Sequence, residues 1–230
     1  MERRDDILLL KASVEVVPNS YLCPMNKLIL STAYFPPIEY VAAIAKADEI
    51  VIETQETYPK QTYRNRCRIS TANGNLDLSI PVKKVNGNHT ITKDILSSEK
   101  ENWRIKHWRA IESAYNASAF FLYYKDEVKE LILNPETNLI EYNSNMLGSI
   151  LNIIGINTNI KYSESYLKQY EDLTDLRNTI SPKVKSKREL PEYFQVFNHK
   201  FPFQSNLSIL DLLFNEGPAT LSYLESINMQ

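Results

Sequence analysis

The chain has 230 residues, of which 43% are hydrophobic and 23% are charged, and its formal net charge is −2. This length allows one large domain or two small ones, and this composition is typical of a globular protein with a sizeable core. The small negative charge excludes an overall positive field that would attract nucleic acid, so any basic site must be local. No apolar run approaches the roughly 20 residues of a membrane span. We therefore expect neither a nucleic-acid partner nor a membrane-spanning segment.

Two cysteines, Cys23 and Cys67, lie far apart in the sequence and form no CxxC pair. This usage predicts reduced thiols, without a disulfide framework or a zinc site. Residues 1–24 lack the apolar core and the cleavage pattern of a signal peptide, so a cytoplasmic location is expected. Met25 opens "MNKLILSTAYF", which resembles a natural protein start. Residues 1–24 are therefore interpreted as a flexible extension or a misassigned start, with an extra strand at 14–17 as the alternative.

The segment "KLILS" (27–31) is a short apolar run that ends before "TAYFPP", and two prolines cannot continue a strand. From Pro37, "PIEYVAAIAKA" predicts a helix with proline in its first turn. The next apolar run, "EIVIET" (49–54), predicts a second strand, and this order is typical of a βαβ unit with parallel strands. Ligands of parallel sheets bind beyond the carboxyl ends of the strands. The segments "AYFPP" and "QETYPKQTYRNR" are therefore expected at one ligand-binding edge.

A β-meander is predicted next, because "RNRCRIST" and "LDLSIPVKK" flank the turn residues Asn73-Gly74, and a second Asn-Gly pair lies at 86–87. After residue 97 the pattern becomes mainly helical, with Ser98 and Glu101 predicting a capping box for the first helix. Later elements are expected as helices over 120–133 and 139–154, a strand near 158–163, an exposed loop over 178–192, and a helix beginning at Ser208 and interrupted near Gly217-Pro218.

The predicted fold class is therefore α/β (α+β), with an N-terminal βαβ unit, a β-meander in the same mixed sheet, and a C-terminal helical part packed on it. We expect one domain over 25–230, with a sheet-rich part over 25–96 and a mainly helical part over 97–230.

Three arginines, Arg64, Arg66 and Arg68, occupy every second position, so on a strand they would project from one face. Guanidinium groups suit phosphate or carboxylate, which predicts an anion-binding wall with Lys60 at its mouth. The alternative is a solvated strand face whose arginines pair with Asp77 across the hairpin. Position near the sheet edge favours ligand contact for Arg64 and Arg66, while Arg68 is interpreted as structural.

His107 lies four residues after Trp103, so both side chains share one helix face. A histidine there is a candidate general acid or base, and the alternative is a buried histidine that is hydrogen-bonded in the core. Glu53 and Gln55 follow the second strand, where they could contact ligand hydroxyls or amines, or else form internal salt bridges. Glu53 and His107 are the candidate catalytic residues. The candidate substrate-binding residues are Tyr34, Gln55, Lys60, Arg64, Asn65, Arg66, Trp103 and Lys106.

Several motifs of well-known chemistries are absent from the sequence. It has five glycines and no P-loop, no dinucleotide fingerprint, no GxSxG, no HExxH and no His/Cys set with metal-ligand spacing. Hydride transfer, P-loop phosphoryl transfer and zinc hydrolysis therefore lack support, no metal site is predicted, and the cofactor is left unknown.

Several segments together resemble the WbqC-like protein family, in the same order from about residue 28 to the end. They are "AYFPPIEYVAAIAKADEIVIE", "KQTYRNRCRIS", "LSIPV", "NWRIKHWRAIESAYNASAFF", "DLR" and "LSILDLLFN". The matching positions are Tyr34, Pro36, Ala47, Asp48, Asn65, Arg66, Pro81, Trp103, Lys106, His107 and Tyr115. The resemblance favours the site interpretation for Arg66 and His107. Where many polysaccharide-cluster members carry Gln-Pro before the tyrosine and Gly-Tyr-Phe after the prolines, this chain reads "STAYF" and "EYV".

The resemblance implies a transferase of O-antigen-type surface polysaccharide, moving glycine or a similar acyl group to an amino sugar. Its partner would be a small anionic substrate, a nucleotide- or lipid-linked sugar. The alternative is a non-enzymatic binding protein for an anionic sugar or an acidic partner. A nucleotidyltransferase-like adenylation is a weaker alternative, because the HxGH-type signature is missing.

Overall fold

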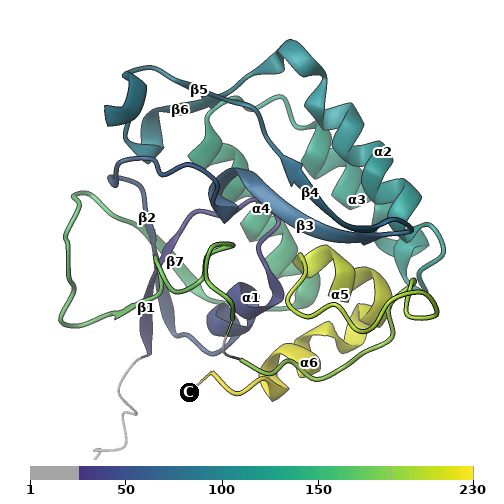
Figure 1. The fold of residues 1–230 in the computed structure, drawn as a ribbon. Coiled ribbons are helices and arrows are strands. Elements are labelled where there is room, and N and C mark those ends of the chain that lie inside the picture. The colour runs from purple at the N-terminus through teal and green to yellow at the C-terminus, as the bar shows by residue number, and fades with distance from the viewer. Residues whose placement is uncertain (1–25, 187, 230) are drawn as a thin grey trace, which may run out of the picture.

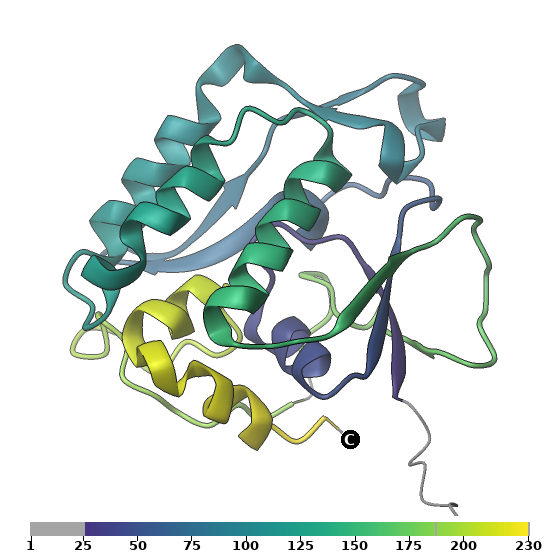
Figure 2. The same cartoon turned by 180° about the vertical axis from the view of Figure 1, so that it is seen from behind.

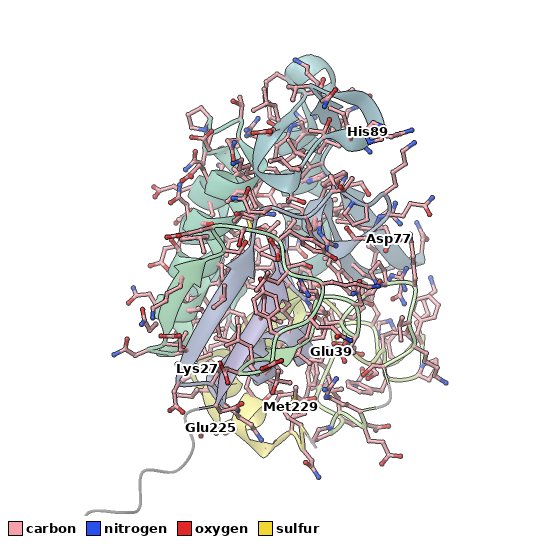
Figure 3. All side chains as sticks on the ribbon, turned by 90° about the vertical axis from the view of Figure 1, so that its left-hand side faces the viewer. Lys27, Glu39, Asp77, His89, Glu225 and Met229 are labelled. Atoms are coloured by element: carbon pink, nitrogen blue, oxygen red, sulfur yellow. The ribbon has the colours of Figure 1, made fainter. Side chains whose placement is uncertain are left out.

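The computed structural model describes residues 26–186 and 188–229. The interpretations of residues 1–24 and of Cys23 lie outside the described residues. Within those residues, no helix is long and apolar enough to cross a membrane. Lys27 and the exposed His89 lie toward opposite ends of the molecule (Figure 3).

Four parallel strands form the central sheet in the order β7-β2-β1-β8 (Figure 1). The strands β1 (Lys27–Ser31) and β2 (Glu49–Glu53) pair in parallel and are connected by the helix α1 (Ile38–Ala45), which confirms the predicted βαβ unit. The outer strands β7 (Asn159–Tyr162) and β8 (Thr174–Asp175) are parallel to their neighbours. All four carboxyl ends therefore meet at one edge.

Two antiparallel hairpins stand apart from this sheet. The first joins β3 (Arg66–Thr71) to β4 (Gly74–Ser79), and the second joins β5 (Val82–Lys84) to β6 (Ile95–Ser97). The hairpin turn at Asn73-Gly74 is confirmed, but the prediction of one mixed sheet is wrong.

Contacts of the first hairpin explain why it does not join the parallel sheet. β3 packs on the helices α2 and α5, and the carbonyl of Arg68 accepts a hydrogen bond from the Ser208 amide at 2.8 Å. The carbonyl of Tyr63, just before the hairpin, accepts from the Tyr34 amide at 2.8 Å. The backbone groups that border the hairpin are thus satisfied by loops and helix ends, because buried backbone groups must find partners.

The helical part contains α2 (Trp103–Tyr115), α3 (Phe121–Leu133), α4 (Leu139–Ile154), α5 (Ile209–Glu216) and α6 (Thr220–Ser226), and Figure 2 shows it from behind. Short 3₁₀ turns are η1 (Tyr63–Asn65), η2 (Gly87–His89), η3 (Thr92–Asp94), η4 (Glu99–Glu101) and η5 (Gly217–Ala219).

Helix ends follow local sequence, with one exception. Gly155 ends α4 in the left-handed region at φ 87°, and the Ser208 hydroxyl accepts from the Leu210 amide at the start of α5, as expected. The predicted capping box at Ser98 and Glu101 is wrong. Glu101 belongs to the 3₁₀ turn η4, and Ser98 precedes that turn without a side-chain capping hydrogen bond. The helix α2 begins after Asn102, which adopts a left-handed conformation at φ 48°. Asparagine tolerates that conformation better than most residues.

The described residues of the segment 178–192 (178–186 and 188–192) form no regular element, as predicted for a loop. It is nevertheless anchored to the protein, because Ile180 and Leu190 are buried and join the hydrophobic core.

Candidate functional site

Polar side chains lie at or just after the carboxyl ends of all four parallel strands. Ser31 ends β1, Glu53 ends β2, Ser163 follows β7, and Arg177 follows β8. The fully buried Glu53 carboxylate accepts from the Ser163 hydroxyl at 2.6 Å and from Arg177 Nη1 at 2.9 Å. The Ser31 hydroxyl contacts the Arg177 carbonyl at 3.4 Å. We use the name carboxyl-edge network for these residues and three neighbours, namely Ser31, Glu53, Ser163 and Arg177 together with Glu56, Arg64 and Asp175.

Arg177 connects the network to the segment between β7 and β8. Its Nη2 bonds the Asp175 carboxylate at 2.6 Å, and its Nη1 donates to the Leu167 carbonyl at 3.0 Å. The guanidinium also lies between two aromatic rings, 5.3 Å from the Tyr166 centroid and 5.0 Å from that of Tyr170. The hydrogen bond to Asp175 raises the pKa of Arg177, so the side chain stays charged.

Arg64 joins the same network from another direction. It lies in the 3₁₀ turn η1 and not on the strand, and its side chain is only 5% exposed. Its Nη2 bonds the Glu56 carboxylate at 2.6 Å and also donates to the Ser31 hydroxyl. Burial raises the pKa of the Glu56 carboxyl, while the charge of Arg64 opposes that rise. The expectation that three arginines project from one face is therefore wrong for Arg64.

The other two arginines project together from the hairpin. Arg68 Nε bonds Asp77 at 2.7 Å, and Arg66 Nη1 reaches the same carboxylate at 3.5 Å. Arg66 Nε also donates to the Ser79 hydroxyl at 3.1 Å. The pairing of hairpin arginines with Asp77 is confirmed, and the two guanidinium groups share this one carboxylate.

Three further residues that were predicted to bind substrate have different surroundings in the structure. The Asn65 side-chain amide donates to the Ile80 carbonyl at 2.8 Å and thereby holds the base of the hairpin. Lys60 and Lys106 are exposed, the latter on α2.

His107, Tyr34 and Trp103 lie together, as the shared helix face predicts, but in the interior. The Tyr34 hydroxyl and His107 Nδ1 are 2.9 Å apart, and the rings of Trp103 and His107 lie 5.2 Å apart. His107 is 6% exposed, and burial lowers its pKa to about 4, against a hydrogen bond to the Ser79 backbone. This geometry is that of a neutral, hydrogen-bonded core histidine.

An open cavity of about 760 Å³ adjoins the carboxyl-edge network. We call it the entrance cavity, because Thr54, Gln55 and Ser163 from the strand ends form part of its wall. The Gln55 side-chain amide donates to the Thr54 hydroxyl at 2.9 Å and to the Ser163 carbonyl at 3.3 Å. The remaining lining residues are Lys93, Ile140, Glu141, Lys161, Tyr162 and Glu164. Both cations and carboxylates therefore surround the opening.

Sequence reasoning found Glu53 and Gln55 but not Ser163 or Arg177. These two residues follow strands that pair with β2 and β1 only across more than 100 residues of sequence. The available signal for Arg177 was its place in the "DLR" segment, which carries part of the family resemblance. Among the described residues, no group of three or more His, Cys, Asp or Glu side chains could hold a metal ion.

Comparison with known families gives a clear match. The model of the WbqC-like protein family matches residues 32–188, which is more than half of the chain. The chain belongs to the WbqC-like protein family. The matched region contains Glu53, Gln55, Arg64, Ser163 and Arg177.

A curated relative also matches nearly the whole chain. The "Uncharacterized protein Rv1507c" of Mycobacterium tuberculosis is 28% identical over 225 residues, which cover 85% of this chain and 96% of that protein. No solved structure matches the chain.

Proposed function

We propose that this WbqC-like protein is a transferase that acts on an anion-bearing sugar of surface-polysaccharide type at the entrance cavity. The observation that carries the proposal is the position of this cavity, directly beside a buried polar network built from the ends of four parallel strands. That edge is the usual ligand position of open parallel sheets. The volume of about 760 Å³ is also within the range of small-molecule sites.

The lining residues match the chemistry of a nucleotide- or lipid-linked sugar. The exposed ammonium group of Lys93 would bind a phosphate or carboxylate of the substrate. The half-buried Gln55 side chain would bind sugar hydroxyls through its amide oxygen, which is a hydrogen-bond acceptor. In this proposal Lys93 supplies the anion contact, in place of the arginine row, in which each arginine already contacts a carboxylate.

Glu53 and Arg177 would act as positioning residues. Glu53 Oε1 accepts from the Gln55 backbone amide at 2.8 Å and from the Ser163 hydroxyl, so it fixes two residues of the cavity wall. Its other oxygen is bonded by Arg177. A carboxylate held by this many donors is fixed in place and therefore orients the residues that it contacts.

The transfer would form an amide on an amino sugar. The acceptor nitrogen attacks the carbonyl carbon of an activated acyl donor, such as a thioester or an acyl phosphate, and the bond from that carbon to the leaving group breaks. The nitrogen loses one proton in the step. Glu141, exposed in the first turn of α4 and part of the cavity wall, is the proposed proton acceptor.

The proposal is tested by incubating the protein with nucleotide-linked amino sugars and activated acyl donors, and by detecting the acylated sugar by mass spectrometry. Gln55→Ala and Lys93→Ala should each weaken sugar binding, and Glu141→Gln should reduce turnover about 100-fold or more with little change in binding. Lys83→Ala, an exposed change on β5, is the matched control. Binding without turnover in the unmodified protein would favour the binding-protein alternative.

A further inference from the structure

Two adjoining cavities flank the loop that follows β8. One, of about 760 Å³, lies between the loop and the C-terminal residues Ser226 and Asn228. The other, of about 740 Å³, lies between the same loop and the first hairpin. They share the lining residues Val184, Lys185, Ser186, Arg188 and Glu189. We call the two cavities together the loop groove, and they share no lining residue with the entrance cavity.

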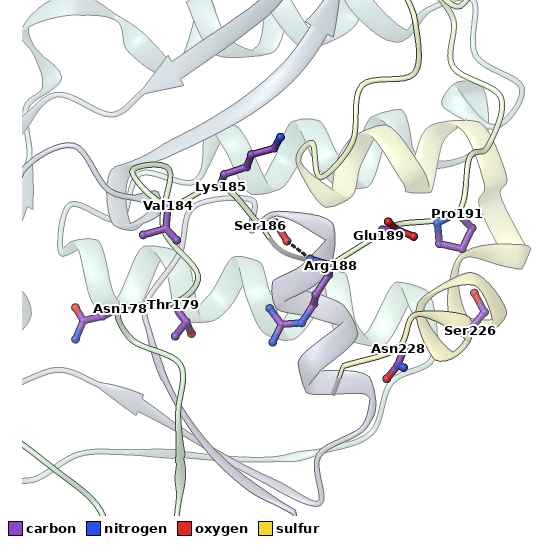
Figure 4. Close-up of a pocket in the computed structure, with 10 residues that line it drawn as sticks. All are labelled: Asn178, Thr179, Val184, Lys185, Ser186, Arg188, Glu189, Pro191, Ser226 and Asn228. Atoms are coloured by element: carbon purple, nitrogen blue, oxygen red, sulfur yellow. Dashed lines mark hydrogen bonds between the residues drawn. The ribbon is translucent and has the colours of Figure 1, made fainter.

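The loop carries a local excess of positive charge in a chain whose net charge is −2. Residues 182–188 contain four basic residues and no acidic one. Lys183 and Lys185 are exposed along the groove, whereas Glu189 and Glu192 follow this basic stretch. Lys185 and Arg188 extend to opposite sides of the loop, so cations face both cavities (Figure 4).

A buried carboxylate of α1 holds the loop in place. Glu39 lies in the first turn of α1, and its Oε2 accepts from the Ser186 hydroxyl at 2.6 Å. Arg188 Nη1 reaches the same oxygen at 3.5 Å, and the Arg188 backbone amide donates to the Ser186 hydroxyl at 3.2 Å. These contacts order the arginine before any ligand binds, which lowers the entropic cost of binding.

Arg188 retains donor capacity toward a ligand. Its Nε is buried and has no hydrogen-bond partner in the part of the chain that the structure describes. Buried polar atoms in native proteins are nearly always satisfied, so this Nε is an exception. The Arg188 side chain as a whole is 20% exposed and lines both cavities, so part of its guanidinium can be reached from the groove. Arginine binds phosphate and carboxylate through two adjacent donors.

We infer that the loop groove binds the phosphate or carboxylate group of a small anionic ligand, with Arg188 as the ordered contact and Lys183 and Lys185 as the charged rim. Asn178, Thr179 and Ser226 supply further polar groups on the Arg188 side. This site is distinct from the entrance cavity, and the inference does not rest on the proposed function.

Titration calorimetry with inorganic pyrophosphate tests the inference, with citrate as a second arm that separates phosphate from carboxylate recognition. The measurement uses the Lys93→Ala protein, in which the anion contact proposed for the entrance cavity is absent. The double change Lys183→Ala and Lys185→Ala should weaken pyrophosphate binding about tenfold or more, because two exposed cations are removed. Lys83→Ala is the control and should leave the affinity unchanged. Raising the salt concentration should weaken binding in the parent and much less in the double variant.

Arg188→Lys separates ligand contact from loop docking. Lysine retains the charge that faces Glu39 but not the planar fork, so the fold should persist, as read by circular dichroism, while pyrophosphate affinity falls. The inference is overturned if pyrophosphate does not bind at millimolar concentration, or if the double variant and Arg188→Lys bind it as tightly as the parent. Pyrophosphate binding that is present in the wild type and lost in the Lys93→Ala protein would also overturn it and leave the proposed function standing.

Discussion

The guanidinium of Arg177 bonds the carboxylate of Glu53 at 2.9 Å where β8 and β2 end, and both side chains are almost completely buried. Burial of either charge costs free energy, and the opposite charge beside it compensates that cost. Glu53 in turn holds the Gln55 amide and the Ser163 hydroxyl at the wall of the entrance cavity. The pair therefore couples the stability of the sheet edge to the shape of the proposed site.

Arg177→Ala should destabilise the protein by about 3–5 kcal/mol, because it leaves the Glu53 carboxylate buried without its cation. Urea unfolding followed by circular dichroism measures the loss. Arg66→Ala is the control, since its contact with Asp77 is partly exposed and such pairs contribute about 0–1 kcal/mol. Equal effects of the two changes would contradict the interpretation of Arg177 as the buried cation that compensates the Glu53 carboxylate.

His107 should make stability depend on pH. Burial lowers its pKa to about 4 in the folded protein, from an ordinary value of 6.5, so between these values the unfolded chain binds the extra proton. The stabilisation is therefore fully present above pH 6.5 and is lost as the pH falls toward 4, by about 3 kcal/mol in total. Comparing the free energy of unfolding of wild type and His107→Gln at pH 7 and pH 4.5 isolates this contribution. The difference should shrink at the lower pH, and a difference that is independent of pH would refute a buried neutral histidine.

Two glycines should respond in opposite directions to alanine. Gly217 has φ +53°, and a Cβ atom there would overlap the Phe120 ring, so Gly217→Ala should destabilise the protein by about 1–3 kcal/mol. Gly148 lies inside α4 with open space around it, so Gly148→Ala should stabilise by up to about 1 kcal/mol. Thermal unfolding of both variants checks this pair of predictions, and a Gly217→Ala protein as stable as the wild type would contradict the close approach of Gly217 and Phe120.

Local patterns in the sequence predicted much of the fold, and the failures have physical causes. The strands β1 and β2, the helix between them, and the Gly155 and Ser208 helix ends depend on short-range signals, and these were confirmed. The two-residue strand β8 carries no pattern of its own and exists because it pairs with β1. The hairpin was predicted correctly as a hairpin, but its independence from the parallel sheet depends on distant contacts such as Ser208 with Arg68.

For the candidate site, the sequence predicted where some residues lie along the elements, but not where every side chain points or whether it is buried. The positions of Glu53 and Gln55 at a strand end follow from the βαβ pattern. The alternating arginines predicted that Arg64 shares a strand face with Arg66 and Arg68. Arg64 instead lies in the 3₁₀ turn η1, which directs its side chain to Glu56. Periodicity placed His107 beside Trp103 correctly, yet it could not distinguish a cleft from the core.

The most direct test of the entrance cavity as the functional site is a thermal-shift panel of nucleotide-linked sugars on wild type, Gln55→Ala and Lys93→Ala, with Lys83→Ala as control. A ligand at 100 times its dissociation constant stabilises by roughly 2.7 kcal/mol. In a chain of this length this corresponds to roughly 2–4 °C per kcal/mol. We predict a salt-sensitive shift for at least one phosphate-bearing sugar that is retained in Lys83→Ala and strongly reduced in Gln55→Ala and Lys93→Ala. A shift of equal size in all four proteins, or none in the wild type, would contradict the assignment of the site.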